Sequence, residues 1–527
     1  MLERLKRLRD KDTRRLVLIL ATGKMLGVAL LLGAIWGFQS FLGGAPAQAA
    51  AEPITHAPND FISPINTLWV LVAAFLVFFM QAGFMALEAG FARSRETVNI
   101  MLECIFDTCL CGILYWGVGF AFQFGEGNGF IGHQFFFLQG IPETYGTTGV
   151  AFLAFFLFQF AFADTASTIT SGAMVGRTSF KGDIFYSFAV SAFIYPIIGH
   201  WVWGPGGWLG NMSIPFLSSM TNGALFRDFA GSTVVHTVGG FVALWGAIAL
   251  GPRIGRKFKA EGGGPLPPHD LTIAAIGAVI LWFGWYGFNP GSTLSALDFS
   301  GIGRVAANTT LAACAGGLVG VFYVYPRSKK WDLGMMCNTF LGGLVAITAP
   351  CYWVSPFGAV VIGAIAGIVV PVGVDLLEKW RVDDPIGAWP VHGLTGIWGT
   401  LAVGLFATGQ YGIPTADGVD TSTVVTGLFY GGGMSQLTAQ FIGSITAVVA
   451  VSAVSIALMY GLKAFNVLRI SRDGELEGLD IHEHGTPAYH MEFGQGMTYT
   501  TLIGAGNGPG SSAPPEVPSS PRVGAET

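Results

Sequence analysis

Charged residues are scarce in this sequence. Of its 527 residues only 11% are Asp, Glu, Lys or Arg, whereas 52% are hydrophobic. Soluble domains carry about a quarter charged residues, so the composition argues against a soluble protein and predicts an integral membrane protein. The 76 glycines favour close contacts between membrane helices.

The sequence also lacks a basic domain and a metal-binding pattern. Its basic residues lie in short loops, so we expect no nucleic-acid partner. No C-x-x-C pair occurs among the six cysteines, and no haem-attachment motif is present. Metal sites need Cys, His or carboxylate ligands at suitable spacing, so we expect no metal and no other cofactor.

The N-terminus has the pattern of a targeting segment. A basic region from Arg4 to Arg15 precedes an apolar run from Leu16 to Leu42, and the small residues of APAQAA follow. This pattern predicts a secretory signal at residues 1–49, cleaved to leave residues 50–61 as a short extracellular N-terminus. The apolar run is longer than that of most signals, so a retained first span is the alternative.

Apolar stretches long enough to cross a bilayer recur after Asn66, separated by short polar loops. We predict eleven spans, all helical because an open strand edge cannot be satisfied in lipid. They lie near 67–92, 97–122, 149–175, 183–203, 229–251, 271–290, 305–325, 334–352, 356–377, 387–407 and 435–463. The predicted fold class is therefore all-α integral membrane, with a membrane domain at 62–465 and a tail at 466–527.

Basic residues orient this predicted bundle. Lys and Arg occupy every second loop, starting with Arg93 and Arg95 in the first, and the intervening loops hold almost none. Because cytoplasmic loops carry the excess of Lys and Arg, the N-terminus is expected outside and the C-terminal tail in the cytoplasm.

One motif occurs twice in the chain. DFAGSTVVHTVGG begins at Asp228 and DPIGAWPVHGLTG begins at Asp384, each with a His eight residues after its Asp and a Gly four residues later. The predicted fifth span enters from outside and the tenth from the cytoplasm, so the two units run in opposite directions. Spans one to five and six to ten are then an inverted repeat around a central pore, with the last helix outside it.

The two motif histidines, His236 and His392, are expected to meet near the membrane centre. Eight helical residues advance about 12 Å, roughly to the middle of a core of about 30 Å. A single membrane histidine is often a packing residue, but two at matched positions favour a function. We interpret them as neutral imidazoles lining a narrow apolar pore for a small polar molecule.

Aromatic and hydroxyl residues are predicted at the outer mouth of this pore. The stretch from Phe158 to Thr165 offers aromatic rings in the third span, Trp203 lies at the outer end of the fourth, and Phe288 and Ser292 lie at the outer end of the sixth. An indole face and a hydroxyl suit a small cation. The alternative is the aromatic belt that membrane proteins carry at their interfaces.

These motifs resemble those of the ammonium transporter, methylammonium permease and Rhesus family over about residues 62 to 490. The resemblance is carried by FFMQAGFMALEAGFARSR, DFAGSTVVH, GWYGFNPGS, DDPIGAWPVHG and ELEGLDIHEHG, in that order. It implies that His236 and His392 are the twin pore histidines and that Phe162 and Phe288 are the stacked gate above them.

The resemblance also assigns the outer mouth. Trp203 and Ser292 resemble the site that recruits ammonium, and their presence favours the ammonium-transporter branch over the Rhesus branch. Asp228 resembles the buried acid near this site. A purely structural role for Asp228, as the N-cap of its helix, is equally compatible with the sequence.

The function that the resemblance implies is transport by a homotrimer in the cell membrane. Ammonium is recruited outside, deprotonated and conducted as ammonia, methylammonium being a second substrate. The first part of the tail is expected to contact a neighbouring subunit, near the face where PII-type regulators bind. The tail after about residue 504 is expected to be disordered.

Alternatives are a passive Rhesus-like channel for ammonia or carbon dioxide and an ammonium sensor with the same fold. An enzyme such as a membrane oxidase would need more deep histidines than two.

Two positions depart from the family pattern, and two acidic residues lie within a predicted span. Gly176 stands where the family often has Glu, which leaves Arg177 without that charge partner, and His482 stands where plant members commonly have a phosphorylatable Thr. Glu103 and Asp107 in the second span lie on one helical face and could form a proton relay. We favour burial with hydrogen-bonded partners for both and leave them out of the site.

Overall fold

The computed structural model describes residues 61–415, 418–420 and 423–489. The signal expected at residues 1–49 and the disordered tail expected after about 504 lie outside the described residues. The described part is mostly helical, as the composition predicted. Its chain order begins with α3 (Ile62–Phe91), α4 (Thr97–Leu114), α5 (Phe120–Phe124), α6 (Phe152–Gly172), α7 (Phe180–Ala189), α8 (Tyr195–Trp203) and α10 (Val238–Leu250).

The second half of the chain continues the bundle. It contains α11 (Leu271–Phe288), α12 (Phe299–Ser328), α13 (Leu333–Thr348), α14 (Pro356–Trp380), α15 (Thr395–Phe406) and α16 (Ser435–Ala464), followed by the short helices α17 (Arg472–Glu477) and α18 (Leu479–His484). Helix α9 (Pro215–Met220) and the hairpins β1–β2 (Thr144–Tyr145 and Val150–Ala151) and β3–β4 (Ile413–Thr415 and Gly418–Asp420) lie in connecting loops.

The helices have the length and apolarity expected of a multi-pass membrane protein. Among the described residues, nine helices are long and apolar enough to cross a membrane, and α13 is a shorter apolar helix. Helix also occupies the predicted segment at 387–407, where a π-helical turn, η8 (Trp389–Leu394), precedes α15. The total of eleven spans and the inverted repeat stay predictions.

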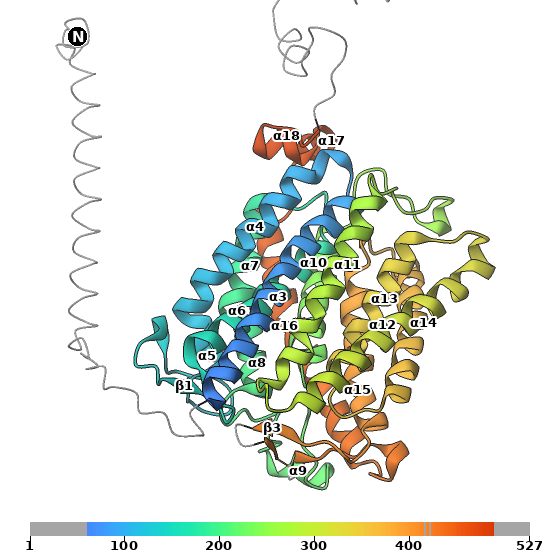
Figure 1. Ribbon diagram of the computed structural model, residues 1–527. Coiled ribbons are helices and arrows are strands. Elements are labelled where there is room, and N and C mark those ends of the chain that lie inside the picture. Colours follow the sequence, from blue (N-terminus) through green and yellow to red (C-terminus); the bar gives the residue numbers. More distant parts are fainter. Residues whose placement is uncertain (1–60, 416–417, 421–422, 490–527) are drawn as a thin grey trace, which may run out of the picture. The chain divides into compact units, whose positions relative to one another are not determined.

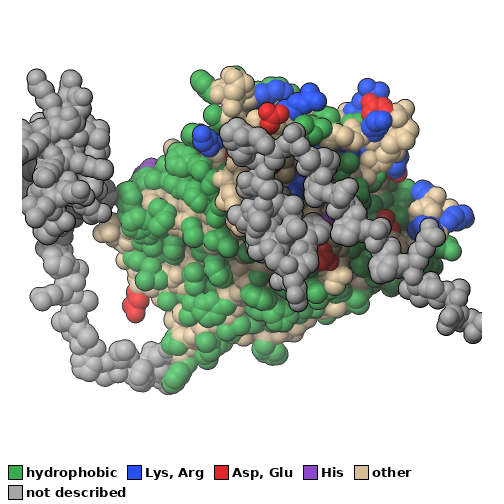
Figure 2. Space-filling model, turned by 90° about the horizontal axis from the view of Figure 1, so that it is seen from above, with side chains coloured by type: hydrophobic (Ala, Val, Ile, Leu, Met, Phe, Trp, Pro, Cys, Tyr) green, Lys and Arg blue, Asp and Glu red, His purple; other side chains and the backbone are tan. Residues whose placement is uncertain are grey.

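The two ends of the bundle carry different elements. The tail face is the end at which α17 and α18 lie, and the opposite face is the end that holds α9 and the hairpins (Figure 1). Figure 2 looks onto the tail face, where basic side chains gather along one side and hydrophobic side chains cover much of the flank. Exposed hydrophobic side chains of the membrane helices, such as Phe75, Phe79 and Ile113, suit contact with lipid.

Local sequence explains where several helices begin. The side chains of Asp270, Asp298 and Asp332 accept hydrogen bonds from backbone N–H groups in the first turns of α11, α12 and α13. Ser179 and Ser355 do the same for α7 and α14. These side chains satisfy N–H groups that have no partner within the helix.

Glycines allow a close and extensive contact between α3 and α11, which run side by side (Figure 1). A Cβ atom on Gly83 would lie 2.9 Å from the Leu281 side chain, and one on Gly90 would lie 2.5 Å from the backbone nitrogen of Ala274. Only glycine permits this approach of two backbones.

Candidate functional site

The two repeated motifs fold in the same way. Each histidine lies in a π-helical turn at the start of a membrane helix: His236 in η5 (Ser232–Thr237), before α10, and His392 in η8, before α15. The motif glycines allow close packing behind these turns, because a Cβ atom on Gly396 would lie 2.5 Å from the carbonyl oxygen of Ser232. Isolated π-turns occur frequently at functional sites.

The Asp that opens each motif caps its turn. The Asp228 carboxylate accepts hydrogen bonds from the N–H groups of Gly231, Thr233 and Val234 at 2.8, 2.8 and 3.0 Å. The Asp384 carboxylate accepts from Gly387, Ala388 and Trp389 at 2.9, 3.0 and 2.9 Å. The structural role considered for Asp228 is therefore present, and it is the same on both sides of the repeat.

Burial raises the pKa of both capping carboxyls, and the backbone N–H groups that they accept from act in the opposite direction. Both carboxylate oxygens of Asp228 thus accept hydrogen bonds from backbone N–H groups.

The structure brings the two histidines together. His236 Nδ1 lies 3.1 Å from His392 Nδ1, and the two rings are 0% and 7% exposed. One ring must donate and the other accept in this hydrogen bond, so two doubly protonated rings cannot make it. Among the described residues, Nε2 of His236 has no hydrogen-bond partner.

Aromatic rings extend the histidine pair into a column. Phe162 and Phe288 stack with ring centroids 4.0 Å apart and an interplanar angle of 22°. Phe288 in turn stacks on His236 at 5.4 Å, and Trp203 meets the edge of Phe162 at 6.3 Å. The order from the opposite face inward is therefore Trp203, Phe162, Phe288, His236 and His392, which we call the histidine column.

A pocket lies at the outer end of the column. It is lined by Phe162, Trp203, Asp228 and Ser292, among others, and we call it the vestibule. The Trp203 indole N–H donates to the carbonyl of Asp228 at 2.7 Å, which fixes the ring. The Ser292 hydroxyl donates to the carbonyl of Phe288 at 2.7 Å, so its oxygen lone pairs are left to face a cation.

A second, smaller cavity lies at the other end of the column. It is lined by His392 together with Phe84, Glu88 and Val391. The column therefore separates two cavities, and the stacked Phe162 and Phe288 rings stand between the vestibule and the histidines.

Trp285 also belongs to this column, although the motifs of the sequence did not predict it. Its ring stacks on His236 with centroids 5.2 Å apart and an interplanar angle of 21°, and its N–H donates to Thr348 Oγ1 at 2.9 Å. The signal was available, because Trp285 lies three residues before Phe288 and such residues share a helical face.

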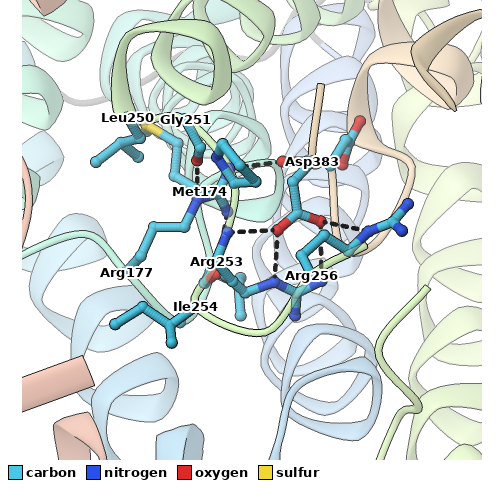
Figure 3. A network of polar contacts seen from close by, with 12 residues as sticks. Met174, Arg177, Leu250, Gly251, Arg253, Ile254, Arg256 and Asp383 are labelled. Carbon is cyan, nitrogen blue, oxygen red and sulfur yellow. Dashed lines mark hydrogen bonds and ion pairs between the residues drawn. The ribbon is translucent and has the colours of Figure 1, made fainter. Parts of the chain in front are cut away.

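Arginine and aspartate side chains form a buried network at the tail face (Figure 3). The Arg177 guanidinium donates to the backbone carbonyls of Gly251 at 2.9 Å and Asp383 at 2.5 Å. The Asp383 carboxylate accepts from the Arg253 side chain at 2.9 and 3.0 Å, and Arg256 pairs with it at 3.5 Å. Burial raises the pKa of Asp383, but Arg177 and Arg253 outweigh this effect and hold it well below its usual range.

The space that an acidic side chain at position 176 would occupy is taken by the carboxylate of Glu96. Gly176 has φ of +79°, and a Cβ atom on it would lie 2.6 Å from the Glu96 carboxylate. Glu96 pairs with Arg93, which also donates to the Gly176 carbonyl at 3.2 Å. A carboxylate therefore occupies the space above Gly176, supplied by the residue preceding α4.

The short tail helices dock onto this same face. The Asp480 carboxylate accepts from the backbone N–H of Asn99 at 3.0 Å, and the Glu483 carboxylate accepts from Phe180 N–H at 2.8 Å. Glu475 accepts from the backbone N–H of Ile254 at 2.5 Å and pairs with Arg469 at 2.7 Å. The tail thus contacts α4, α7 and the loop after α10 of its own chain.

Comparison with known proteins identifies the family. A family model described as the Ammonium Transporter Family matches residues 68–489. The chain belongs to this family. Ammonium transporter Amt2 of Archaeoglobus fulgidus is 44% identical over 83% of this chain and 90% of that protein. Ammonium transporter 1 member 3 of Solanum lycopersicum is 40% identical over 81% of this chain and 93% of its own length.

Solved structures agree with this assignment. A structure called Sensor Amt Protein has a TM-score of 0.71 at 36% identity, over 80% of this chain and 99% of the other. Candida albicans Mep2 has a TM-score of 0.70 at 28% identity, over 79% of this chain and 89% of the other. The resemblance on which the sequence analysis relied is confirmed, and this member of the ammonium transporter family is a multi-pass membrane protein.

Proposed function

We propose that this transporter recruits the ammonium ion in the vestibule, removes one proton there and conducts ammonia along the histidine column. The observation that carries the proposal is the column itself: two buried imidazoles in hydrogen-bonding contact, closed toward the vestibule by stacked Phe162 and Phe288. A neutral molecule with both donors and acceptors suits such a path, whereas a bare cation would lose its hydration there.

The vestibule supports recruitment of a cation. The Trp203 ring edge-on to Phe162 and the acceptor oxygen of Ser292 offer the π-face and lone pairs that a small cation prefers. Asp228 also lines the pocket, but its carboxylate oxygens accept hydrogen bonds from backbone N–H groups. We therefore assign Asp228 mainly a structural role, and secondarily an electrostatic attraction for the cation.

Eleven spans run from an extracellular N-terminus to a cytoplasmic tail, in the cell membrane, with spans one to five and six to ten as inverted repeats. The equivalent caps made by Asp228 and Asp384, and the π-turns that follow both, support the repeat. We further propose a homotrimer whose tail face receives a PII-type regulator, by analogy with the family.

The alternatives are less well supported. A Rhesus-like channel for neutral gases would have no use for Trp203 and Ser292 at the mouth. A sensor role is favoured only by the likeness to the structure called Sensor Amt Protein, whereas the curated relatives compared above are named transporters.

Uptake into proteoliposomes tests the proposed function. We expect the reconstituted full-length protein to accumulate labelled methylammonium faster than protein-free vesicles, and we expect ammonium, but not potassium, to compete. Uptake equal to that of protein-free vesicles, or competition by potassium as strong as by ammonium, would contradict the proposal.

A further inference from the structure

His200 makes a pair of contacts that a neutral histidine cannot make. The ring is 0% exposed and lies in the last turn of α8, three residues before Trp203. Its Nδ1 lies 2.8 Å from the backbone carbonyl oxygen of Gln123, and its Nε2 lies 2.7 Å from that of Asn128. A carbonyl oxygen only accepts hydrogen bonds, so both ring nitrogens must donate. Only the imidazolium carries a proton on both nitrogens.

Another histidine of the chain shows the neutral arrangement. His269 Nδ1 lies 3.1 Å from the carbonyl oxygen of Ala92, but its Nε2 lies 3.0 Å from the hydroxyl oxygen of Tyr489. A hydroxyl group can donate, so one nitrogen of His269 can accept and the ring can stay neutral. Both partners of His200 are acceptors, and together they favour its cationic form.

The position of His200 also suits a positive charge. His200 lies in the last turn of the membrane helix Phe180–Trp203, and Gln123 lies in the last turn of the membrane helix Ser94–Phe124. α8 and α5 are the final parts of these two helices, and they contact each other near the opposite face (Figure 1). The last carbonyl groups of a helix carry about half a negative charge. The two helix ends together therefore offset the charge of one buried imidazolium.

The elements packed against His200 carry few other titratable or charged residues. Glu126 and His133 belong to the loop that follows α5, and both are exposed. The remaining ones are buried or half-buried: Tyr115, Tyr145, Tyr195, Arg227 and Asp228. In the described part of the chain, no ion pair joins any of these residues to His200. The two carbonyl contacts are therefore the interactions that change when His200 gains or loses its proton.

The contact between His200 and Gln123 supports the end of the helix that carries Trp203. Gly204 follows Trp203 directly and donates its N–H to the His200 carbonyl at 3.0 Å. A Cβ atom on Gly204 would lie 2.3 Å from His200 Nδ1 and 2.4 Å from the Gln123 carbonyl oxygen. The chain thus passes directly over this hydrogen bond. A shift of either partner must move Gly204 and the indole beside it.

The loop after α5 is attached to the same helix end by two further hydrogen bonds. The Trp201 indole N–H donates to the carbonyl of Phe130 at 2.9 Å, and the backbone N–H of Trp208 donates to the carbonyl of Gly129 at 2.9 Å. Neither depends on protonation. The contacts of His200 are therefore the titratable part of this attachment.

We propose that His200 is a positioning residue of the vestibule: as an imidazolium it joins the outer ends of two membrane helices and thereby holds Trp203 against the bound cation. The proposal rests on the proposed function. When the imidazolium releases one proton to the external water, a nitrogen lone pair is left facing a carbonyl oxygen. One of the two contacts then breaks, and Trp203 loses its support. Ammonium binding weakens, while conduction along the histidine column, which does not include His200, continues.

Uptake of labelled methylammonium by the full-length protein in proteoliposomes tests this proposal. Methylammonium is an alkylammonium like the lysine side chain, so it stays protonated between about pH 6 and about pH 8.5. His200→Gln removes the titrating group and keeps an amide donor. His133→Gln is the matched control, because His133 lies exposed in the loop after α5. The half-saturating concentration and the maximal rate are measured across this range of external pH.

The half-saturating concentration should rise with external pH in the wild type and in the control. In His200→Gln it should be high at every pH. At the acidic end the variant should exceed the wild type by about two- to thirtyfold, the range expected for loss of a cation–π contact. Maximal rates should be equal, because conduction does not involve His200.

Three results would overturn the proposal. The first is a pair of parallel pH profiles for the wild type and His200→Gln. The second is a half-saturating concentration that falls as pH rises in the wild type, because the charge of His200 would then act by repelling the cation and not by positioning Trp203. The third is a lower maximal rate in His200→Gln at an unchanged half-saturating concentration.

A spectroscopic measurement keeps the proposal testable if His200→Gln fails to fold. Solid-state NMR of wild type with isotope-labelled histidine is recorded at about pH 7.5, where exposed histidines are mostly neutral. One ring should have both nitrogens protonated and both close to backbone carbonyl carbons, and the absence of such a ring would overturn the proposal. A wild type whose half-saturating concentration is independent of pH overturns the role of His200 alone. A wild type that takes up no methylammonium overturns the proposed function.

Discussion

His236 and His392 approach each other through the same ring atom, with Nδ1 3.1 Å from Nδ1. The contact is possible only when one ring donates and the other accepts. The two histidines are therefore one unit: a change of tautomer or charge in either ring changes what the other can offer. Trp285 and Phe288 stack on His236, which fixes the orientation of this unit.

The first prediction concerns the vestibule. Trp203→Leu should weaken binding of ammonium and methylammonium by about 0.5–2 kcal/mol, because the π-face that attracts the cation is removed. The half-saturating methylammonium concentration for uptake measures this effect. Trp331→Leu is the matched control, since Trp331 is 63% exposed, lies between α12 and α13 and does not line the vestibule. An unchanged half-saturating concentration in Trp203→Leu would show that Trp203 does not bind the cation and belongs only to the interfacial aromatic belt.

The second prediction separates the two roles of Asp228. Asp228→Ala should destabilise the protein by about 0.5–2 kcal/mol, because three backbone N–H groups lose their acceptor. Asp228→Asn keeps an acceptor oxygen and removes the charge, so it should fold but need more ammonium for half-saturation. Asp384→Asn is the matched control, because Asp384 makes the same cap away from the vestibule. Equal shifts in half-saturation for the two Asn variants would contradict the electrostatic role.

The third prediction concerns the network at the tail face. Asp383→Asn should lower stability by about 3–5 kcal/mol, because Arg253 is left buried without its counter-charge. Asp375→Asn, which breaks the exposed pair with Lys259, should cost about 0–1 kcal/mol. Thermal unfolding in detergent measures both, and similar midpoints for the two variants would count against the network.

The same network gives a pH dependence with a definite sign. The folded-state pKa of Asp383 is lowered, by Arg177 and Arg253 acting against burial. Its contribution is therefore complete above the ordinary Asp pKa of about 4 and is lost as pH falls through the lower folded value. The stability difference between wild type and Asp383→Asn should shrink on acidification and stay constant near neutral pH.

The fourth prediction concerns the docked tail. Burial lowers the pKa of His484, although the nearby Glu483 and Asp480 act in the opposite direction. The docked state thus prefers neutral His484, so docking should be complete above about pH 6.5 and weaken as pH falls toward the lower docked value. Hydrogen exchange of residues 472–484 should increase on acidification in the wild type and much less in His484→Gln. Equal pH dependence in both would exclude His484 as the cause.

The sequence predicted the histidine pair because the spacing within each motif is local. Each motif has an Asp, a His eight residues later and a Gly four residues after that. These residues supply the cap, the buried ring and the close helix contact of a single helix. The gate role of Phe162 and Phe288 came from the family resemblance, whereas the indole of Trp203 and the hydroxyl of Ser292 already suited a small cation by their chemistry. Their distances in the structure agree with a column and a vestibule, and their functional roles remain proposals.

Contacts between distant segments could not be predicted in this way. The sequence marked position 176 as lacking an acid, but not that Glu96 fills the space, because this depends on how two loops meet at the tail face. It placed Glu103 and Asp107 on one face of α4, but assumed partners for them. Only the packing of α4 against α7 shows what this face meets, and in the described residues no donor reaches either oxygen of Asp107 or Oε1 of Glu103.

The most direct test of the account is electrical recording of ammonium pulses and potassium pulses on reconstituted wild type, His236→Ala and His392→Ala, with His133→Ala as the control because His133 lies exposed in a loop. The account predicts that the wild type and the control respond to ammonium alone. Each pore variant should lose the ammonium response or admit potassium, while remaining folded at equal abundance. Ammonium responses and potassium exclusion equal to the wild type in both pore variants would contradict the histidine column as the path.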